Sequence, residues 1–177
     1  MNFALIYFYN HIRINIHTYD GKRGLFMIIR KAKVQDVQGI YKLIAFYAKE
    51  GQLLIRTPAS ICEDILSFYV AIENDEVVGA GSLYVYDESL CEIRSLAVSE
   101  NHMQKGIGKK ITQKIVEDAH LLGINDMISL TYQVEFFSKL GFEVISKETI
   151  PQKVRKDCLS CPKFFACDET AMMVHLN

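Results

Sequence analysis

The order of apolar and polar residues becomes regular at Met27 and predicts the first elements of the fold. Met27–Arg30 is typical of a short strand. The next apolar positions lie three or four residues apart, as on one face of a helix that ends at Gly51; they are Val34, Val37, Tyr41, Ile44 and Ala48. Thr57 as a cap and Pro58 as the first helical residue predict a second helix, with an inner side that carries Ile61, Ile65 and Leu66.

Strands and one long helix follow. The segments 68–72 and 77–86 are predicted to pair as a hairpin across residues 73–76, and 91–98 is a third strand. After a polar break at 99–105, a helix closed by Gly123 is predicted from the spacing of Ile107, Ile111, Ile115, Ala119 and Leu122. We then expect a buried strand at 127–131, a short helix at 135–140 ended by Gly141, a strand at 142–147 and an edge strand at 171–176.

Composition limits the class of protein. With 177 residues, of which 50% are hydrophobic and 23% charged, the sequence predicts one globular domain. The formal net charge of -1 gives no overall positive field for nucleic acid or anionic lipid. The apolar stretch Phe3–Tyr9 is far shorter than the ~20 residues that a membrane-spanning helix needs. We therefore expect a cytoplasmic protein that binds neither nucleic acid nor membranes.

Residues 1–26 do not share this pattern and are interpreted as an N-terminal extension to a domain that spans 27–177. One hypothesis is that Met27 is the true start, because Lys22, Arg23 and Gly24 can be encoded by a purine-rich stretch that resembles a bacterial ribosome-binding site. The alternative is an additional strand, or a tail that packs on a partner. The mass of the intact native protein separates these hypotheses.

The junction between the strand 91–98 and the long helix is a candidate anion site. The helix begins at Gly106, Ile107 and Gly108, with Lys105 and Lys109 beside them. Free amide N–H groups and the positive dipole end of a helix bind phosphate, and glycine lets it approach the backbone closely. Taken alone, a glycine-rich helix start is also consistent with a tight turn.

The order of CEIRSLAV, this loop and helix, and EFFSKLGF resembles the GNAT acetyltransferase superfamily. The resemblance implies an α/β (α+β) fold: a mixed, mostly antiparallel sheet flanked by helices on both faces and splayed between the strands 91–98 and 127–131. Acetyl-CoA would enter that splay. By position, the resemblance implies that the pantetheine arm binds along Leu96, Ala97 and Val98. The pyrophosphate would bind at Gln104, Lys105, Gly106, Ile107, Gly108 and Lys109. Met103 departs from the family, which usually has Gln or Arg there.

Within the superfamily the chain is most similar to the short N-acetylglutamate synthase type, which lacks an amino-acid-kinase domain. The segments that carry this likeness are LLIRTPASI, CEIRSLAV, LTYQVEFFSKLGF and PQKVRKDCLSCPKFFACDE. The resemblance implies transfer of acetyl from acetyl-CoA to the α-amine of L-glutamate, at the start of arginine biosynthesis.

The resemblance suggests candidates for three catalytic groups: the base, the donor that stabilises the oxyanion, and the acid. Glu92 matches the family's base, although a pair with Arg94, two residues along the same strand face, would also explain it. A backbone N–H near Val98 could hold the oxyanion. The tyrosine that serves as acid in many relatives is replaced by Phe137. Thr131 and its neighbour Tyr132 are the alternatives for that acid, or are simply residues at a strand end.

Glutamate carries two carboxylates, which arginine binds with a planar fork. Arg56 matches the arginine of the family's glutamate-binding segment and is the first candidate. Arg94 is a second choice, as are Lys153 and Arg155 in the basic tail. A solvated charged loop is the alternative for each.

Cys158, Cys161 and Cys167 have the spacing C-x2-C-x5-C. A structural zinc site needs a fourth ligand, which would have to be Cys62, Cys91, Asp168 or His175. Zinc or iron binding therefore competes with free thiols that pack or sense redox state, and we assign no metal.

Two other functions stay open. The chain could acetylate another small amine, or it could sense acetyl-CoA, redox state or a metal without turnover. The hydrophobic composition and the N-terminal extension would suit a homodimer.

Overall fold

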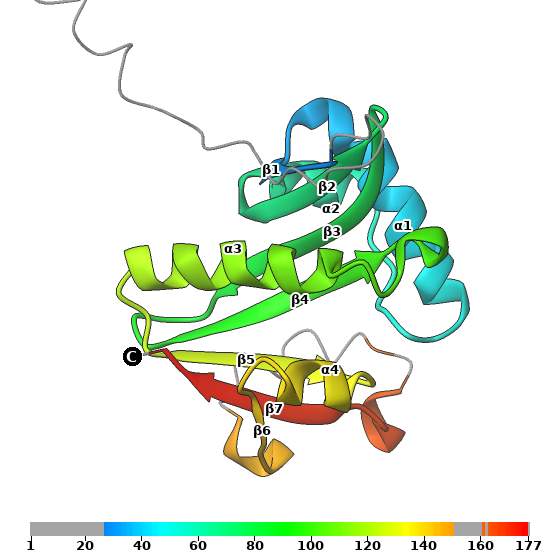
Figure 1. Ribbon diagram of the computed structural model, residues 1–177. Coiled ribbons are helices and arrows are strands. Elements are labelled where there is room, and N and C mark those ends of the chain that lie inside the picture. Colours follow the sequence, from blue (N-terminus) through cyan, green and yellow to red (C-terminus); the bar gives the residue numbers. More distant parts are fainter. Residues whose placement is uncertain (1–26, 151–160, 162, 177) are drawn as a thin grey trace, which may run out of the picture.

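The computed structural model describes residues 27–150, 161 and 163–176. Within that part of the chain seven strands form one sheet, in the order β1-β2-β3-β4-β5-β7-β6 (Figure 1). Neighbouring strands are antiparallel except β4 and β5, which are parallel. The strands are β1 (Met27–Lys31), β2 (Phe68–Glu73), β3 (Glu76–Val85), β4 (Leu90–Val98), β5 (Asp126–Thr131), β6 (Glu143–Val144) and β7 (Thr170–His175).

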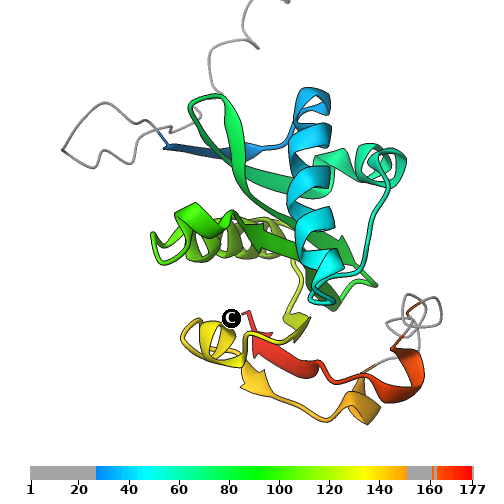
Figure 2. The same ribbon diagram turned by 90° about the vertical axis from the view of Figure 1, so that its right-hand side faces the viewer.

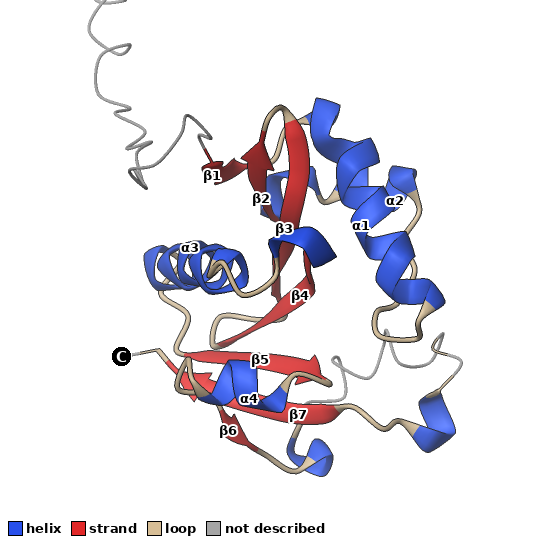
Figure 3. Cartoon of the chain, turned by 45° about the vertical axis from the view of Figure 1, so that its right-hand side comes forward, coloured by secondary structure: helices blue, strands red, loops and turns tan. Residues whose placement is uncertain are grey.

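Helices cover both faces of the sheet (Figures 2 and 3). One face carries α1 (Val37–Lys49) and α2 (Pro58–Glu63), and the other carries α3 (Ile107–Leu121) and α4 (Val134–Ser138). Each face has its own hydrophobic core, because every helix buries a single apolar stripe. Short 3-10 turns lie at Val34–Asp36, Ile65–Ser67, Glu100–His102, Lys147–Thr149 and Phe164–Ala166. The predicted mixed sheet with helices on both faces is confirmed.

The helix ends follow the local signals in the sequence. Thr57 Oγ1 accepts a hydrogen bond from the backbone N–H of Ser60 (3.1 Å), and Pro58 is the first residue of α2. The chain leaves α1 through Gly51 (φ 69°) and α3 through Gly123 (φ 74°), a left-handed conformation that favours glycine. These caps confirm the predicted bounds to within two residues.

Two leucines that we predicted on inner helix faces are exposed. Leu66 is 83% exposed, because α2 ends at Glu63 and the tighter 3-10 turn that follows shifts the phase of the side chains. Leu122 is 62% exposed, because α3 ends at Leu121. Spacing alone does not show where a helix stops.

Two strand predictions near the C-terminus were also wrong in part. The strand expected at 142–147 is reduced to Glu143–Val144, because a 3-10 turn capped by Ser146 begins directly after it. The strand at 171–176 was expected at the edge, but β7 lies between β5 and β6. The two-residue β6 thus forms this edge of the sheet and leaves little unpaired backbone there.

No helix in the described part of the chain is long and apolar enough to cross a membrane. The extension predicted at 1–26, and the tail residues Lys153, Arg155 and Cys158, lie outside the described residues.

Candidate active site

The sheet opens between β4 and β5. These strands pair only over Leu90–Glu92 and Asp126–Ile128, and then diverge (Figure 1). A cleft of about 1220 Å³ lies where they part. Its walls come from the loop between α1 and α2, from β4, from the loop before α3, from the end of β5, and from Glu169. The splay predicted between these two strands is therefore confirmed.

A bulge bends β4 at this opening. Ser95 and Leu96 together stand opposite the single residue Gly81 of β3. Ser95 has a φ of 53°, in the left-handed region that some bulges use. Gly81 has no room for a side chain, because a Cβ there would lie 2.9 Å from Cγ2 of Ile111 and 3.0 Å from Cδ1 of Leu96. Glycine thus lets the bulged strand and α3 pack closely.

The bulge also changes which side chains share a face. Residues directly opposite each other in β3 and β4 point the same way, and the bulge adds one residue to that count. Glu92 and Arg94 therefore lie on the α1 side together with Ala97, whereas Leu96 and Val98 pack toward the core under α3. The bulge thus shifts the alternation of β4: even-numbered residues face α1 before it and the core under α3 after it.

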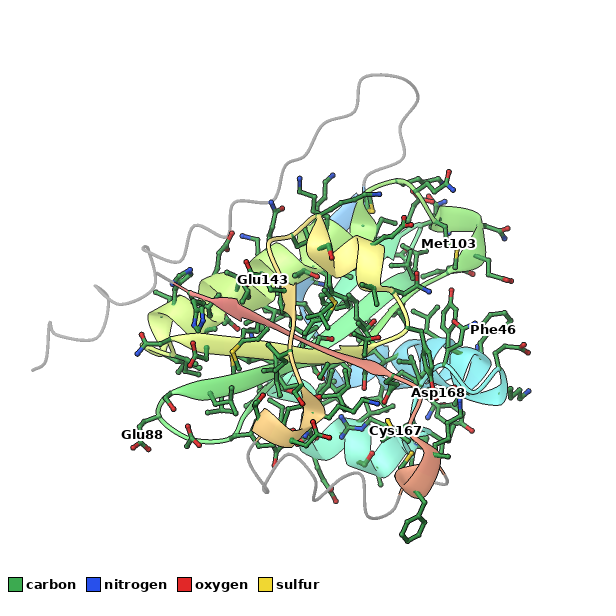
Figure 4. The ribbon with its side chains drawn as sticks, turned by 90° about the horizontal axis from the view of Figure 1, so that it is seen from below. Phe46, Glu88, Met103, Glu143, Cys167 and Asp168 are labelled. Carbon is green, nitrogen blue, oxygen red and sulfur yellow. The ribbon has the colours of Figure 1, made fainter. Side chains whose placement is uncertain are left out.

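The loop before α3 ends in a tight left-handed turn. Gln104 (φ 62°) and Gly106 (φ 74°) are both in the left-handed region, and Gly106 directly precedes the first residue of α3. A Cβ at Gly106 would meet nothing within 4 Å, so this backbone faces open space beside the cleft. Gly108 differs, because a Cβ there would lie 3.3 Å from the ring of Phe136. Met103 in the same loop is exposed (Figure 4).

Glu92 is 8% exposed and belongs to a hydrogen-bonded cluster. Tyr86 Oη donates to Glu92 Oε2 (2.6 Å). Arg94 donates through Nε to the same carboxylate and through its other arm to Tyr86 Oη, while its guanidinium lies 3.6 Å from the ring centroid of Tyr84. Burial, followed by the charge of Glu92, raises the pKa of Tyr86, so this phenol stays a donor at neutral pH.

Both interpretations of Glu92 thus describe the same geometry, since the candidate base is also the partner of Arg94. Sequence reasoning missed Tyr84 and Tyr86. The register of β3 against β4 places Tyr84 opposite Glu92, and this register is known only from the structure.

Arg56 lines the cleft but already has partners. Its guanidinium donates to the backbone oxygen of Ser60 (2.9 Å) and to Asp64, and lies 5.5 Å from the ring centroid of Phe68. Its side chain is 19% exposed, so it is not the solvated loop residue of the alternative interpretation.

Thr131 and Tyr132, the candidates for a catalytic acid, differ in their surroundings. Thr131 is buried, and its Oγ1 accepts from the backbone N–H of Gln133 (2.9 Å). Tyr132 Oη donates to Asp168 (2.6 Å) and accepts from Lys163 Nζ (2.9 Å). Burial raises the pKa of Tyr132, and the hydrogen bond to Asp168 adds to this. Tyr132 is thus tied to the C-terminal segment.

That segment reaches the end of α1. Figure 4 shows Asp168 on the same side of the molecule as Phe46 of α1, and Lys163 Nζ donates to the backbone oxygen of Gly51 (3.4 Å) just beyond that helix. Phe137, where the resemblance to the GNAT superfamily led us to expect a tyrosine, is 3% exposed and stacks edge-on against Phe142.

Comparison with known proteins identifies the family of this chain. Residues 64–144 match the model of the acetyltransferase (GNAT) domain. An uncharacterized N-acetyltransferase of Chlorobaculum tepidum is 39% identical over 145 residues, which are 82% of this chain and 94% of that protein. The chain belongs to the GNAT acetyltransferase family. It is an acetyl-CoA-dependent N-acetyltransferase by that membership.

Two further GNAT relatives are more specific. An amino-acid acetyltransferase of Mycobacterium tuberculosis is 32% identical over 131 residues, 72% of this chain and 74% of that protein. The crystal structure of N-acetylglutamate synthase from Neisseria gonorrhoeae, complexed with coenzyme A and N-acetyl-glutamate, superposes with a TM-score of 0.78 at 25% identity. The match covers 88% of this chain and 36% of that longer one.

The cysteines of this GNAT domain do not gather around a metal in the part that the structure describes. No group of three His, Cys, Asp or Glu side chains there could hold an ion. Cys161 and Cys167 are half-buried free thiols. Cys91 is fully buried in β4, and burial raises the pKa of its thiol to about 12, so it is inert at neutral pH.

Glu169 is a second acid of the cleft, also missed from the sequence. It directly precedes β7 and reaches the cleft only because β7 returns beside β5. Burial raises the pKa of Glu169, and the charge of Glu92 raises it further. Two carboxylates therefore influence each other in the GNAT cleft.

This shift predicts a pH-dependent effect of Glu169→Gln on stability. The folded protein holds the Glu169 proton more tightly than the unfolded chain, so the stability that protonation contributes is complete below the ordinary value of 4.5. It is lost as pH rises through the raised pKa. Glutamine mimics the protonated form at every pH, so Glu169→Gln should raise Tm by about 1–3 °C at pH 8. Thermal unfolding at pH 4.5 should show almost no difference; equal shifts at both pH values would contradict the argument.

Proposed function

We propose that this acetyltransferase acts on the α-amine of L-glutamate, the first step of arginine biosynthesis. The observation that carries the proposal is a cleft that joins the loop before α3, the carboxylate of Glu92 and the two arginines Arg56 and Arg94. The names of the Mycobacterium and Neisseria relatives support the same substrate class.

The reaction needs two protons to move. Glu92 takes one from the α-ammonium group, breaking an N–H bond and forming O–H, and later releases it to solvent. The free amine attacks the acetyl carbonyl carbon, and the oxyanion is stabilised by a backbone N–H of β4 near Val98. When the C–S bond breaks, one of the two protons still on the nitrogen passes to the leaving thiolate and the other stays in the amide N–H of the product. Thr131 and Tyr132 are the candidate carriers of that second proton.

Acetyl-CoA is assigned to the α3 half of the cleft. Its pyrophosphate would lie on the free amides of the left-handed turn and of the first turn of α3, beside Lys105 and Lys109. Its pantetheine arm would run along the part of β4 that has no partner on the β5 side, Leu96, Ala97 and Val98. The residues of the turn are Gln104, Lys105, Gly106, Ile107, Gly108 and Lys109.

Two glycines that flank α3 allow a matched test of this assignment. Gly106 and Gly123 both have a φ of 74°, and a Cβ at either would meet nothing within 4 Å. Alanine at either position should therefore destabilise the fold to a similar extent, by about 1 kcal/mol. Only Gly106→Ala places a methyl group where the pyrophosphate would bind, and it should raise the KM for acetyl-CoA about tenfold. An equal KM in the two variants would remove the pyrophosphate from this turn.

Arg56 is assigned to the side-chain carboxylate of glutamate. Arg56→Gln should raise the KM for L-glutamate about tenfold and leave the KM for acetyl-CoA unchanged. Asp64→Asn is the matched control, because it breaks the same ion pair but keeps the arginine. A similar rise in both variants would mean that the pair only shapes the loop.

The experiment that tests the proposed function is thiol release from acetyl-CoA in the presence of L-glutamate, beside aspartate, glutamine, spermidine and a lysine peptide. Saturable turnover with glutamate is expected. Turnover with a cationic amine alone would show that this amine, and not glutamate, is the substrate. A cationic amine is the second candidate because the cleft also contains the acidic residues Glu92, Glu135 and Glu169. Binding of acetyl-CoA without turnover of any amine would favour a sensor.

A further inference from the structure

The hydrogen bonds of Arg94 bear directly on how Glu92 becomes available as a base. Arg94 donates to Glu92 and to Tyr86 Oη, and its side chain, 19% exposed, lines the cleft. A carboxylate held by a guanidinium is a weak proton acceptor. The arrangement before substrate binds is therefore one in which the base is paired with a cation.

An α-amino acid brings a competitor for that cation. Its α-carboxylate is one carbon away from its α-ammonium group. An acceptor whose ammonium group reaches Glu92 therefore carries a carboxylate to within a few ångströms of the same place. Arg94 is the next residue on the same face of β4, about 7 Å along the strand. One acceptor molecule can thus contact both side chains at once.

We propose that Arg94 binds the α-carboxylate of the acceptor and gives up Glu92 in exchange, so that recognition of an α-amino acid releases the base. This inference rests on the proposed function and adds to it the residue that reads the α-carboxylate.

The surroundings of Arg94 suit an exchange of partners. Its guanidinium lies 3.6 Å from the ring centroid of Tyr84 and 5.2 Å from that of Tyr86, and this stacking does not depend on which carboxylate it binds. The fork has five N–H donors and matches any carboxylate. Glu92 keeps the hydrogen bond from Tyr86 (2.6 Å) after the cation leaves.

The exchange also explains how the cleft would reject other amines. An amine that has no α-carboxylate cannot displace Glu92 from Arg94, so its proton acceptor stays paired. The enzyme would then discriminate between amines in the deprotonation by Glu92 as well as in binding.

The test is equilibrium binding to the CoA-loaded protein, measured by calorimetry without turnover. The probes are N-acetyl-L-glutamate, L-glutamate and the 1-amide of L-glutamate, which lacks the α-carboxylate. Arg94→Gln should weaken binding of N-acetyl-L-glutamate about 10- to 100-fold and abolish the preference for L-glutamate over its 1-amide. Glu92→Gln should have the opposite effect and raise the affinity for N-acetyl-L-glutamate about threefold or more, because Arg94 no longer has to leave a carboxylate. Lys114→Gln, on the exposed side of α3, is the control for loss of a positive charge.

Each outcome decides between the two proposals. If the unmodified protein with CoA does not bind N-acetyl-L-glutamate, the proposed function fails and the exchange fails with it. If it binds, but Arg94→Gln keeps the preference for L-glutamate over the 1-amide, Arg94 does not read the α-carboxylate. If Glu92→Gln leaves product binding unchanged or weaker, the two side chains do not exchange partners. That last variant decides the matter even if Arg94→Gln does not fold.

Discussion

Glu92→Gln is expected to lower kcat with the preferred amine by about 10²- to 10⁴-fold, the usual loss when a positioned general base is removed. The amide has nearly the shape of the carboxylate and can still accept the hydrogen bond from Tyr86, so the loss reports proton transfer rather than packing. Steady-state thiol release at saturating acetyl-CoA measures the effect.

Glu117→Gln is the control for this variant. Glu117 is an exposed residue of α3 with a lysine partner, so its amide should leave kcat unchanged. The KM for acetyl-CoA should be the same in both variants. If Glu92→Gln retains more than a tenth of the original kcat, another group takes the ammonium proton and Glu92 serves only as the partner of Arg94.

The second large effect concerns the folded state. Ile111→Ala should lower the free energy of unfolding by about 2–5 kcal/mol, because the side chain is fully buried and the cavity that it leaves can close only in part. Ile111 contacts the glycine positions 79 and 81 of β3, where no side chain can move in to fill the space. Tm should fall by about 4–20 °C in a domain of this size.

Leu121→Ala is the comparison for that measurement. Leu121 is 86% exposed on the same helix, so its truncation should change the free energy of unfolding by no more than about 0.5 kcal/mol. Chemical denaturation of the two variants decides the matter. Similar losses in both would mean that the effect comes from helix propensity and not from the core under α3.

The elements of the fold were predictable where their signals are local. The cap at Thr57, the left-handed glycines at 51 and 123, and the hairpin turn across Asn74 and Asp75 each act within a few residues, so their positions follow from neighbouring sequence. The errors at Leu66 and Leu122 have a different origin. Periodicity gives the face of a helix, but the last residue of the helix depends on what the next segment packs against.

The candidate site divides in the same way. Glu92, Arg94 and the glycine turn lie on one continuous stretch of chain, and their order along it could be recognised. Tyr86 and Glu169 could not be found in that way. Tyr86 reaches Glu92 only through the pairing of β3 with β4, and Glu169 only through the return of β7 beside β5. Contacts between distant segments need the register, which a single sequence does not contain.

The bulge at Ser95 has a consequence for how this enzyme can diversify. Before it, Glu92 and Arg94 face the α1 side, which is proposed for the acceptor; after it, Leu96 and Val98 face the core under α3. Substitutions at 92 and 94 can therefore create a new acceptor preference while the backbone that would hold the common donor stays unchanged. Deletion of residue 95 would have a different effect, because it would remove the extra residue of the bulge. The side chains on one side of the deletion would then point to the opposite face of the sheet. The strand β4 should therefore tolerate substitutions at 92 and 94, but not the insertion or deletion of a residue.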